Sequence, residues 1–250
     1  MKNILIFICS IALCSACNSA TTTRLMSYNI RNGYGMDKTV SLERIAQVIN
    51  NADVEAVALQ EVDSITGRYP IDVATRVGEL TDMHATYGAS IDFMGGKYGV
   101  AILTREKPLS HFRVPLPCRS EPRSLLIVEL EDYYFCCTHL SLHEEDRIKS
   151  VAIIEQTLAT LDKPAILAGD INATPDEQSI KNLKKSFQVF DKQGSGGKLT
   201  WPADKPEMEI DYIALYNGNG AVADVKQHYV VEATVESDHR PIIAEITIKN

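Results

Sequence analysis

The chain has 250 residues, and 45% of them are hydrophobic, which is enough for a sizeable buried core. Its 25 basic residues stand against 33 acidic ones, a formal net charge of −8 at pH 7. This balance argues against an extended nucleic-acid-binding surface, because that kind of contact depends on lysine and arginine. It does not exclude a divalent-cation site, because such sites are built from clustered carboxylates.

The N-terminus is typical of a secretory signal peptide. One lysine precedes an apolar stretch, Ile4 to Leu13, that is too short to span a bilayer comfortably. The segment LCSAC is also similar to a bacterial lipobox, with Cys17 as the lipidated residue, although Cys14 stands where leucine is usual. We expect residues 1–16 to be removed, residues 17–23 to form a lipidated tether, and the protein to be exported to the bacterial cell envelope. A buried N-terminal strand or helix is the alternative.

From Arg24 onward, no linker, repeat or charge block divides the chain, so we expect residues 24–250 to form one domain. The first predicted elements are a strand in RLMSYNI, a helix in SLERIAQVIN and a strand in VEAVALQEV. In the helix, the apolar residues Leu42, Ile45 and Ile49 share one face. The segment DVATRVGEL predicts a second helix.

The rest of the chain is richer in strands. Apolar runs predict strands in ATYGASI, YGVAILT, SLLIVEL, YYFCCTHL, PAILAGD, EIDYIAL, VKQHYVV and RPIIAEITI. Helices are predicted after Ser141, where Ser141 and Glu144 have the spacing of a capping box, and in DEQSIKNLKKSF. Several strands follow one another without a helix between them. This favours an α/β fold of two packed sheets flanked by helices over one doubly wound sheet.

Three cysteines remain beyond Cys17, which is too few for a disulfide scaffold. Cys136 and Cys137 are adjacent in a predicted strand, so their side chains should point to opposite faces. At most one of them could pair with Cys118, and simple packing in the core is the favoured alternative. No cysteine or histidine spacing suggests a zinc site.

Polar residues stand at or near the ends of several predicted strands. They are Asn29, Glu61, His139, Asp170, Asn172, Asp211, Asp238 and His239. Taken singly, each could simply be the first solvated residue of a turn. If the strand ends meet at one edge, however, these distant segments build a single cleft.

The residue types in this set divide into chemical roles. The carboxylates and amide oxygens are the hard donors that Mg²⁺ or Mn²⁺ takes. The two histidines supply hydrogen-bond donors and proton acceptors near neutral pH. Arg123, in EPRSLLIVEL, offers a planar fork for a phosphate. Together these groups fit the hydrolysis of a phosphate ester.

Seven motifs in this order resemble the endonuclease/exonuclease/phosphatase family, which includes deoxyribonucleases, abasic-site endonucleases, neutral sphingomyelinases and inositol-polyphosphate 5-phosphatases. They are MSYNI, LQEV, GVAIL, THLS, GDINATP, IDYI and SDHRPI, and the resemblance runs from Arg24 to about Ile248. It implies a four-layer sandwich of two mixed β-sheets flanked by helices. It also implies hydrolysis of a phosphodiester or phosphomonoester by in-line attack of an activated water, with Mg²⁺ or Mn²⁺ as cofactor.

The resemblance implies a role for each matching residue. Asn29, Glu61 and Asp238 would hold the metal. Asp170 and Asn172 would position or activate the attacking water, and whether Asp170 or His239 takes the proton stays open. Asp211 would orient His239, which contacts the phosphate. His139 would contact the phosphate or protonate the leaving oxygen.

The chain departs from the family pattern at one site position. Arg31 follows SYNI where some members carry another acid, which makes a second metal there doubtful and Arg31 a candidate phosphate contact beside Arg123. Trp201, in LTWP, could stack on a substrate or pack in the core.

We expect a monomeric enzyme whose substrate is a small or lipid-derived phosphate ester of unknown identity. It would reach the membrane only through its lipid anchor. A nuclease, or a non-catalytic envelope protein that keeps the fold, is the alternative.

Overall fold

A computed structural model describes residues 20–194 and 196–249. The expected signal peptide and Cys17 lie outside these residues. The first strand begins at Thr21, before the expected domain start at residue 24, and Thr21 to Thr23 pair with the last strand of the chain. No helix in the described part is long and apolar enough to cross a membrane.

The larger of two β-sheets has seven strands in the order β12-β13-β1-β2-β5-β4, with β3 paired to β2. Its strands are β1 (Thr21–Asn29), β2 (Ala56–Thr66), β3 (Tyr69–Asp72), β4 (His84–Phe93), β5 (Gly96–Thr104), β12 (Val222–Val230) and β13 (Ile242–Lys249). Because β1 and β2 are parallel while the other pairs are antiparallel, this sheet is mixed.

The smaller sheet has six strands in the order β10-β11-β9-β8-β7-β6. They are β6 (Ser110–Leu116), β7 (Arg123–Glu129), β8 (Tyr134–His139), β9 (Ala165–Asp170), β10 (Phe187–Val189) and β11 (Asp211–Tyr216). Here β8 and β9 form the parallel pair at the centre of an otherwise antiparallel sheet.

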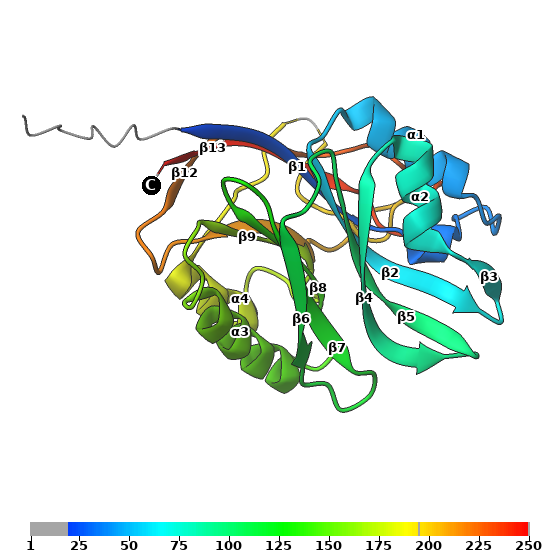
Figure 1. The fold of residues 1–250 in the computed structure, drawn as a ribbon, viewed down its shortest axis with the longest axis horizontal. Helices are drawn as coiled ribbons and strands as arrows, with labels where there is room; N and C mark the ends of the chain where they lie inside the picture. The colour runs from blue at the N-terminus through cyan, green and yellow to red at the C-terminus, as the bar shows by residue number, and fades with distance from the viewer. Residues whose placement is uncertain (1–19, 195, 250) are drawn as a thin grey trace, which may run out of the picture.

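Helices cover the outer face of each sheet, as Figure 1 shows. The helices α1 (Leu42–Ala52) and α2 (Val73–Thr81) pack on the seven-stranded sheet, and α3 (Glu144–Leu158) and α4 (Gln178–Ser186) pack on the six-stranded one. A short 3₁₀ helix, η1 (Arg31–Gly33), follows β1. The arrangement confirms the predicted four-layer sandwich.

Alternation along the strands divides the apolar side chains among three cores. Leu25 faces the core between the sheets, whereas its neighbour Met26 packs under α1 and α2. In the same way Cys137 lies between the sheets, and Cys136 packs beneath α3 and α4. The two thiols therefore point to opposite faces as predicted. Both are free, as is Cys118, so packing and not a disulfide explains them.

The start of α3 differs from the expected capping box. The helix begins at Glu144 with His143 at its N-cap position, and no side chain caps it there. Ser141 lies two residues before the N-cap: its hydroxyl accepts a hydrogen bond from the His143 amide at 3.1 Å and donates to Asp146 at 3.3 Å. The hydroxyl stabilises the turn before the helix and not the helix end itself.

Candidate active site

Strand pairing in the six-stranded sheet brings three distant polar residues to one edge. The parallel strands β8 and β9 end together, with His139 opposite Asp170. Strand β11 is antiparallel to β9, so its first residue, Asp211, also lies opposite Asp170. All three side chains are almost completely buried. Asp170 thus occupies the centre of a row that the sequence spreads over three separate strands.

The seven-stranded sheet supplies the facing residues. A bulge between Leu59 and Val62 places Glu61 at a positive φ of 58°, which turns it out of the regular strand register. At the end of β1, the side-chain amide of Asn29 donates to Glu61 Oε1 and to Asp170 Oδ2, both at 3.1 Å. Asn29 therefore ties together carboxylates from the two sheets.

His239 lies between two carboxylates. Its Nδ1–H donates to Asp211 Oδ2 at 3.0 Å, and its Nε2 is 3.6 Å from Asp170 Oδ2. Burial alone would lower the pKa of His239, but the charges of Asp211 and Asp170 outweigh it and raise this pKa. Burial raises the pKa of Asp170, against the opposing effect of His239. The geometry favours an imidazolium that is held in place by Asp211.

His139 has the opposite electrostatic setting. Arg123 Nη1 lies 3.4 Å from His139 Nδ1, so Nδ1 accepts and the proton is carried by Nε2, which is 3.5 Å from Asp170 Oδ2. Burial, followed by the charges of Arg123 and His239, lowers the pKa of His139 well below its usual value. Glu121 in turn binds Arg123 Nη1. A neutral histidine and a charged one therefore flank Asp170.

The remaining predicted residues lie around this row. The Asn172 amide donates to Asp170 Oδ1 at 2.9 Å, and its side chain donates to the Leu140 carbonyl at 3.0 Å. Asp238 Oδ2 is 3.6 Å from Arg31 Nε. Arg31 also donates its backbone N–H to Asn29 Oδ1 at 3.1 Å. The structure thus brings every predicted site residue of the domain into one neighbourhood.

A cleft of about 360 Å³ opens onto these groups. Its lining includes residues that the sequence did not single out: Glu121, Leu142, Met208 and Ile210. They lie outside helices, and only Ile210, the first residue of IDYI, belongs to one of the seven motifs. Trp201, for which stacking and core packing were both open, is partly exposed and lines the cleft beside Met208. Asn29 and Asp211 do not line the cleft themselves. Asn29 binds the lining residue Glu61, and Asp211 binds the lining residue His239.

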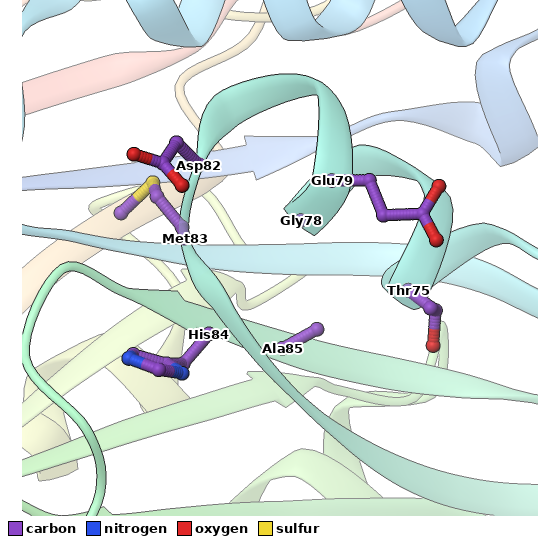
Figure 2. A pocket seen from close by; sticks show the side chains of 7 residues that line it. All are labelled: Thr75, Gly78, Glu79, Asp82, Met83, His84 and Ala85. Atoms are coloured by element: carbon purple, nitrogen blue, oxygen red, sulfur yellow. The ribbon is translucent and has the colours of Figure 1, made fainter.

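A second hollow, of about 370 Å³, lies between the end of α2 and the start of β4. Figure 2 shows its lining. Glu79, Asp82 and His84 point in different directions there and do not converge on a common point (Figure 2). None of the predicted site residues lines it. The chemistry-bearing residues therefore concentrate in the cleft between the sheets.

The donor set of the cleft fits a hard divalent cation. Asp170, Asp211 and His239 come close enough to hold a metal, with one ligand atom each within 4.8 Å of the others. In that group, however, Asp211 Oδ2 and His239 Nδ1 already bind each other. The carboxylates of Glu61 and Asp238 both line the cleft. Burial raises the pKa of Glu61, and the negative charge of Asp238 raises it further. A cation between them would relieve that repulsion.

Comparison with known proteins identifies relatives of the whole domain. Residues 26–239 match the model of the Endonuclease/Exonuclease/phosphatase family. No curated protein sequence matches.

Among solved structures, a similar one is an endonuclease/exonuclease/phosphatase from Beutenbergia cavernae DSM 12333, with 22% identity and a TM-score of 0.74 over 92% of this chain and 72% of that one. Another is the endonuclease/exonuclease/phosphatase of Bacteroides vulgatus, with 18% identity and a TM-score of 0.75 over 90% and 98%. A third is a mannosyl-6-phosphatase of Bacteroides thetaiotaomicron VPI-5482, with 19% identity and a TM-score of 0.70 over 90% and 99%.

Proposed function

The chain belongs to the endonuclease/exonuclease/phosphatase family of metal-dependent phosphoric-ester hydrolases, and we propose that it cleaves a small phosphate ester by in-line attack of water. The observation that carries this proposal is the buried row of Asp211, His239, Asp170 and His139 beneath a single cleft. Such a row offers a proton acceptor between two hydrogen-bond donors, which is what the attack of water on an anionic phosphate requires.

Mg²⁺ or Mn²⁺ would be held by the carboxylates of Glu61 and Asp238. Their charge and their place in the cleft lining support this assignment. The cation would act as a Lewis acid and neutralise charge on the phosphoryl oxygens. Asn29 was expected to hold the metal as well, and we propose it as a positioning residue instead, because its amide nitrogen faces Glu61 and Asp170 while its oxygen accepts from the Arg31 backbone.

We assign proton acceptance to Asp170 and not to His239. His239 gives its Nδ1–H to Asp211 and lies near a second carboxylate, a setting that favours its protonated form. A protonated histidine donates to a phosphoryl oxygen and cannot take a proton from water. Asp170 is a buried carboxylate, and a backbone N–H of Asn172 and the side-chain amide of Asn29 hold its two oxygens in place.

His139 and Arg123 would bind the phosphoryl oxygens from the other side. The neutral His139 presents its Nε2–H near Asp170, and Arg123 is held against His139 Nδ1. Fixed donors of this kind each lower the barrier by about 2.7–4 kcal/mol in enzymes that stabilise a developing oxyanion. Arg31, at 3.6 Å from Asp238, would be a further contact at the edge of the site.

A small or lipid-derived ester suits this cleft better than duplex nucleic acid. The cleft volume of about 360 Å³ fits one compact substituent, and the net charge of −8 opposes a long polyanion. Trp201 and Met208 add an apolar wall to the cleft. The mannosyl-6-phosphatase of similar fold supports including phosphomonoesters of small molecules among the candidates.

A substrate panel tests the proposal. The purified protein should hydrolyse bis-p-nitrophenyl phosphate, or one of a set comprising DNA, RNA, sphingomyelin, inositol phosphates and nucleotides, when Mg²⁺ or Mn²⁺ is present. His239→Ala should abolish the turnover, because it removes a donor and uncovers the Asp211 carboxylate. Full activity in His239→Ala would contradict the proposed mechanism.

A further inference from the structure

Lys192 is a fully buried lysine in the loop after β10. Its side chain is 0% exposed, and its Nζ donates to Glu209 Oε1 at 2.7 Å. Lysine is almost never buried completely unless negative groups compensate its charge, because the ammonium gives up its hydration. The negative groups around Lys192 therefore indicate what its charge acts on.

The contacts of Lys192 lie on both sides of Asp211 in the sequence. Glu209 stands two residues before Asp211, and the ring of Tyr212, the next residue, has its centre 4.6 Å from Lys192 Nζ. These contacts place the ammonium at the start of β11, whose first residue is Asp211. Within residues 20–194 and 196–249, no hydrogen bond or ion pair joins Lys192 to Asp211 itself. Lys192 therefore acts on Asp211 through its charge.

Asp211 has a use for this charge. Its Oδ2 accepts from His239 Nδ1, but its buried Oδ1 has no hydrogen-bond partner in the described part of the chain. A buried carboxylate with one unpaired oxygen is costly as an anion, and a cation nearby reduces that cost without touching the oxygen. The effect is mutual: burial lowers the pKa of Lys192, and the charges of Glu209 and Asp211 oppose this lowering.

Lys192 has no direct access to the reaction. It does not line the catalytic cleft, whereas His239 does. An effect of Lys192 on a phosphate in the cleft must therefore pass through Asp211 and His239. A lysine that only paired with Glu209 would contribute to stability and would leave the Asp211–His239 contact unchanged.

We propose that Lys192 is a positioning residue for the hydrolysis, because its charge stabilises the Asp211 carboxylate that binds His239. This inference rests on the proposed function for its effect on the rate. The electrostatic effect of Lys192 on the Asp211–His239 pair does not depend on turnover, so the inference and the proposed function can fail separately.

Two variants and a control test the proposal. Lys192→Met removes the charge and keeps a long side chain. Lys192→Met/Glu209→Gln removes both members of the buried ion pair, a change that proteins often tolerate, and so leaves no uncompensated carboxylate at position 209. Lys163→Met is the control: Lys163 pairs with Glu129 at 2.9 Å and lies 5.9 Å from the centre of the Tyr134 ring, and none of these three residues lines the cleft.

Two readouts are taken on the full chain. Hydrolysis of bis-p-nitrophenyl phosphate with Mg²⁺ gives kcat and KM. Proton NMR follows the His239 Nδ1–H, which is buried and hydrogen-bonded to Asp211 and is assigned by its absence in His239→Ala. Both Lys192 variants should shift this resonance and lower kcat about tenfold, the lower end of the usual loss for a group that orients a site residue, with KM nearly unchanged. Lys163→Met should match wild type in both readouts.

A second background separates an effect through Asp211 from a general loss of structure. In Asp211→Asn, adding Lys192→Met should lower kcat no further, because the carboxylate on which Lys192 acts is already gone. A wild-type Nδ1–H resonance in the folded Lys192 variants, or an equal loss of kcat with and without Asp211→Asn, would overturn the inference and leave the proposed function intact. A wild-type protein that cleaves no ester would overturn the proposed function, while the resonance would still decide whether Lys192 acts on the Asp211–His239 pair.

Discussion

Asp170 is the residue around which the candidate site is arranged. Its Oδ2 is 3.1 Å from Asn29 Nδ2, 3.5 Å from His139 Nε2 and 3.6 Å from His239 Nε2, while Oδ1 accepts from the Asn172 amide. Both histidines that would act on the phosphate therefore lie next to this carboxylate. Small displacements of its partners should change the rate more than they change substrate binding.

Asp211→Asn tests whether the partners of Asp170 affect the rate more than they affect substrate binding. The amide keeps the size of the side chain but loses the charge that holds His239 as an imidazolium. We expect kcat to fall at least about hundredfold, the usual scale for losing a proton-transfer or charged-donor function, with KM nearly unchanged.

Steady-state kinetics of Asp211→Asn measures this split between kcat and KM. Asp191→Asn, an exposed aspartate paired with Lys198, is the control and should match wild type. An Asp211→Asn enzyme with normal kcat would show that Asp211 does not act through His239.

The sequence allowed the charged members of the site to be predicted, because histidines and carboxylates after apolar strands stand out. It did not reveal Glu121. Glu121 is one acidic residue in an exposed-looking loop, and its pairing with Arg123 depends on the fold.

At the scale of elements, the central strands were predictable and three others were not. Strands β1, β2, β8 and β9 are buried apolar runs. Strand β6 was not predicted, because it is mostly exposed, contains Pro115 and pairs only with β7 at a sheet edge. The missed β3 and β10 are only four and three residues long. The bulge at Glu61 also has no sequence signal, although it aims that side chain.

Strand β12 carries a testable pH dependence. His228 is buried beside Phe190, and burial together with the charge of Lys192 lowers the pKa of His228 to about 3. The unfolded chain, with an ordinary histidine pKa near 6.5, binds this proton more readily. The contribution of the neutral His228 to the free energy of unfolding is therefore complete above about pH 6.5. It is lost as the pH falls toward 3, by about 1.4 kcal/mol for each pH unit.

Urea unfolding at pH values from 7 down to 5 measures this slope. His228→Gln should flatten the loss of unfolding free energy over that range. The control His84→Gln, at an exposed position on β4, should keep the wild-type slope. Identical slopes in wild type and His228→Gln would contradict the assignment.

At the scale of the whole molecule, the two sheets meet so that each supplies half of the site. The seven-stranded sheet brings Asn29 and Glu61, and the six-stranded sheet brings His139, Asp170 and Asp211. The predicted sandwich was correct because consecutive strands and flanking helices leave few alternatives. The substrate was not predictable, since it depends on residues such as Leu142 and Met208, which only the fold brings into the lining of the cleft.

Export and lipidation also belong to this scale, and both remain proposals from the first residues of the sequence. We expect the wild-type protein to fractionate with bacterial membranes and Cys17→Ser to lose that association, because the thiol would carry the lipid. Cys14→Ser, a neighbouring cysteine of the same segment, is the control and should stay with the membranes. Membrane fractionation followed by immunoblotting gives the answer, and a membrane-bound Cys17→Ser protein would refute the anchor.

The central claim is that this cleft hydrolyses a phosphate ester with a divalent cation held at Glu61. Its most direct test is the rate of bis-p-nitrophenyl phosphate hydrolysis by wild type and Glu61→Gln, with Mg²⁺ or Mn²⁺ and after chelation. Glu55→Gln, at an exposed residue just before the other end of β2, serves as control.

We predict turnover only with the metal, an at least hundredfold lower kcat/KM in Glu61→Gln, and wild-type rates in Glu55→Gln. Turnover that survives chelation, or full activity in Glu61→Gln, would contradict the account.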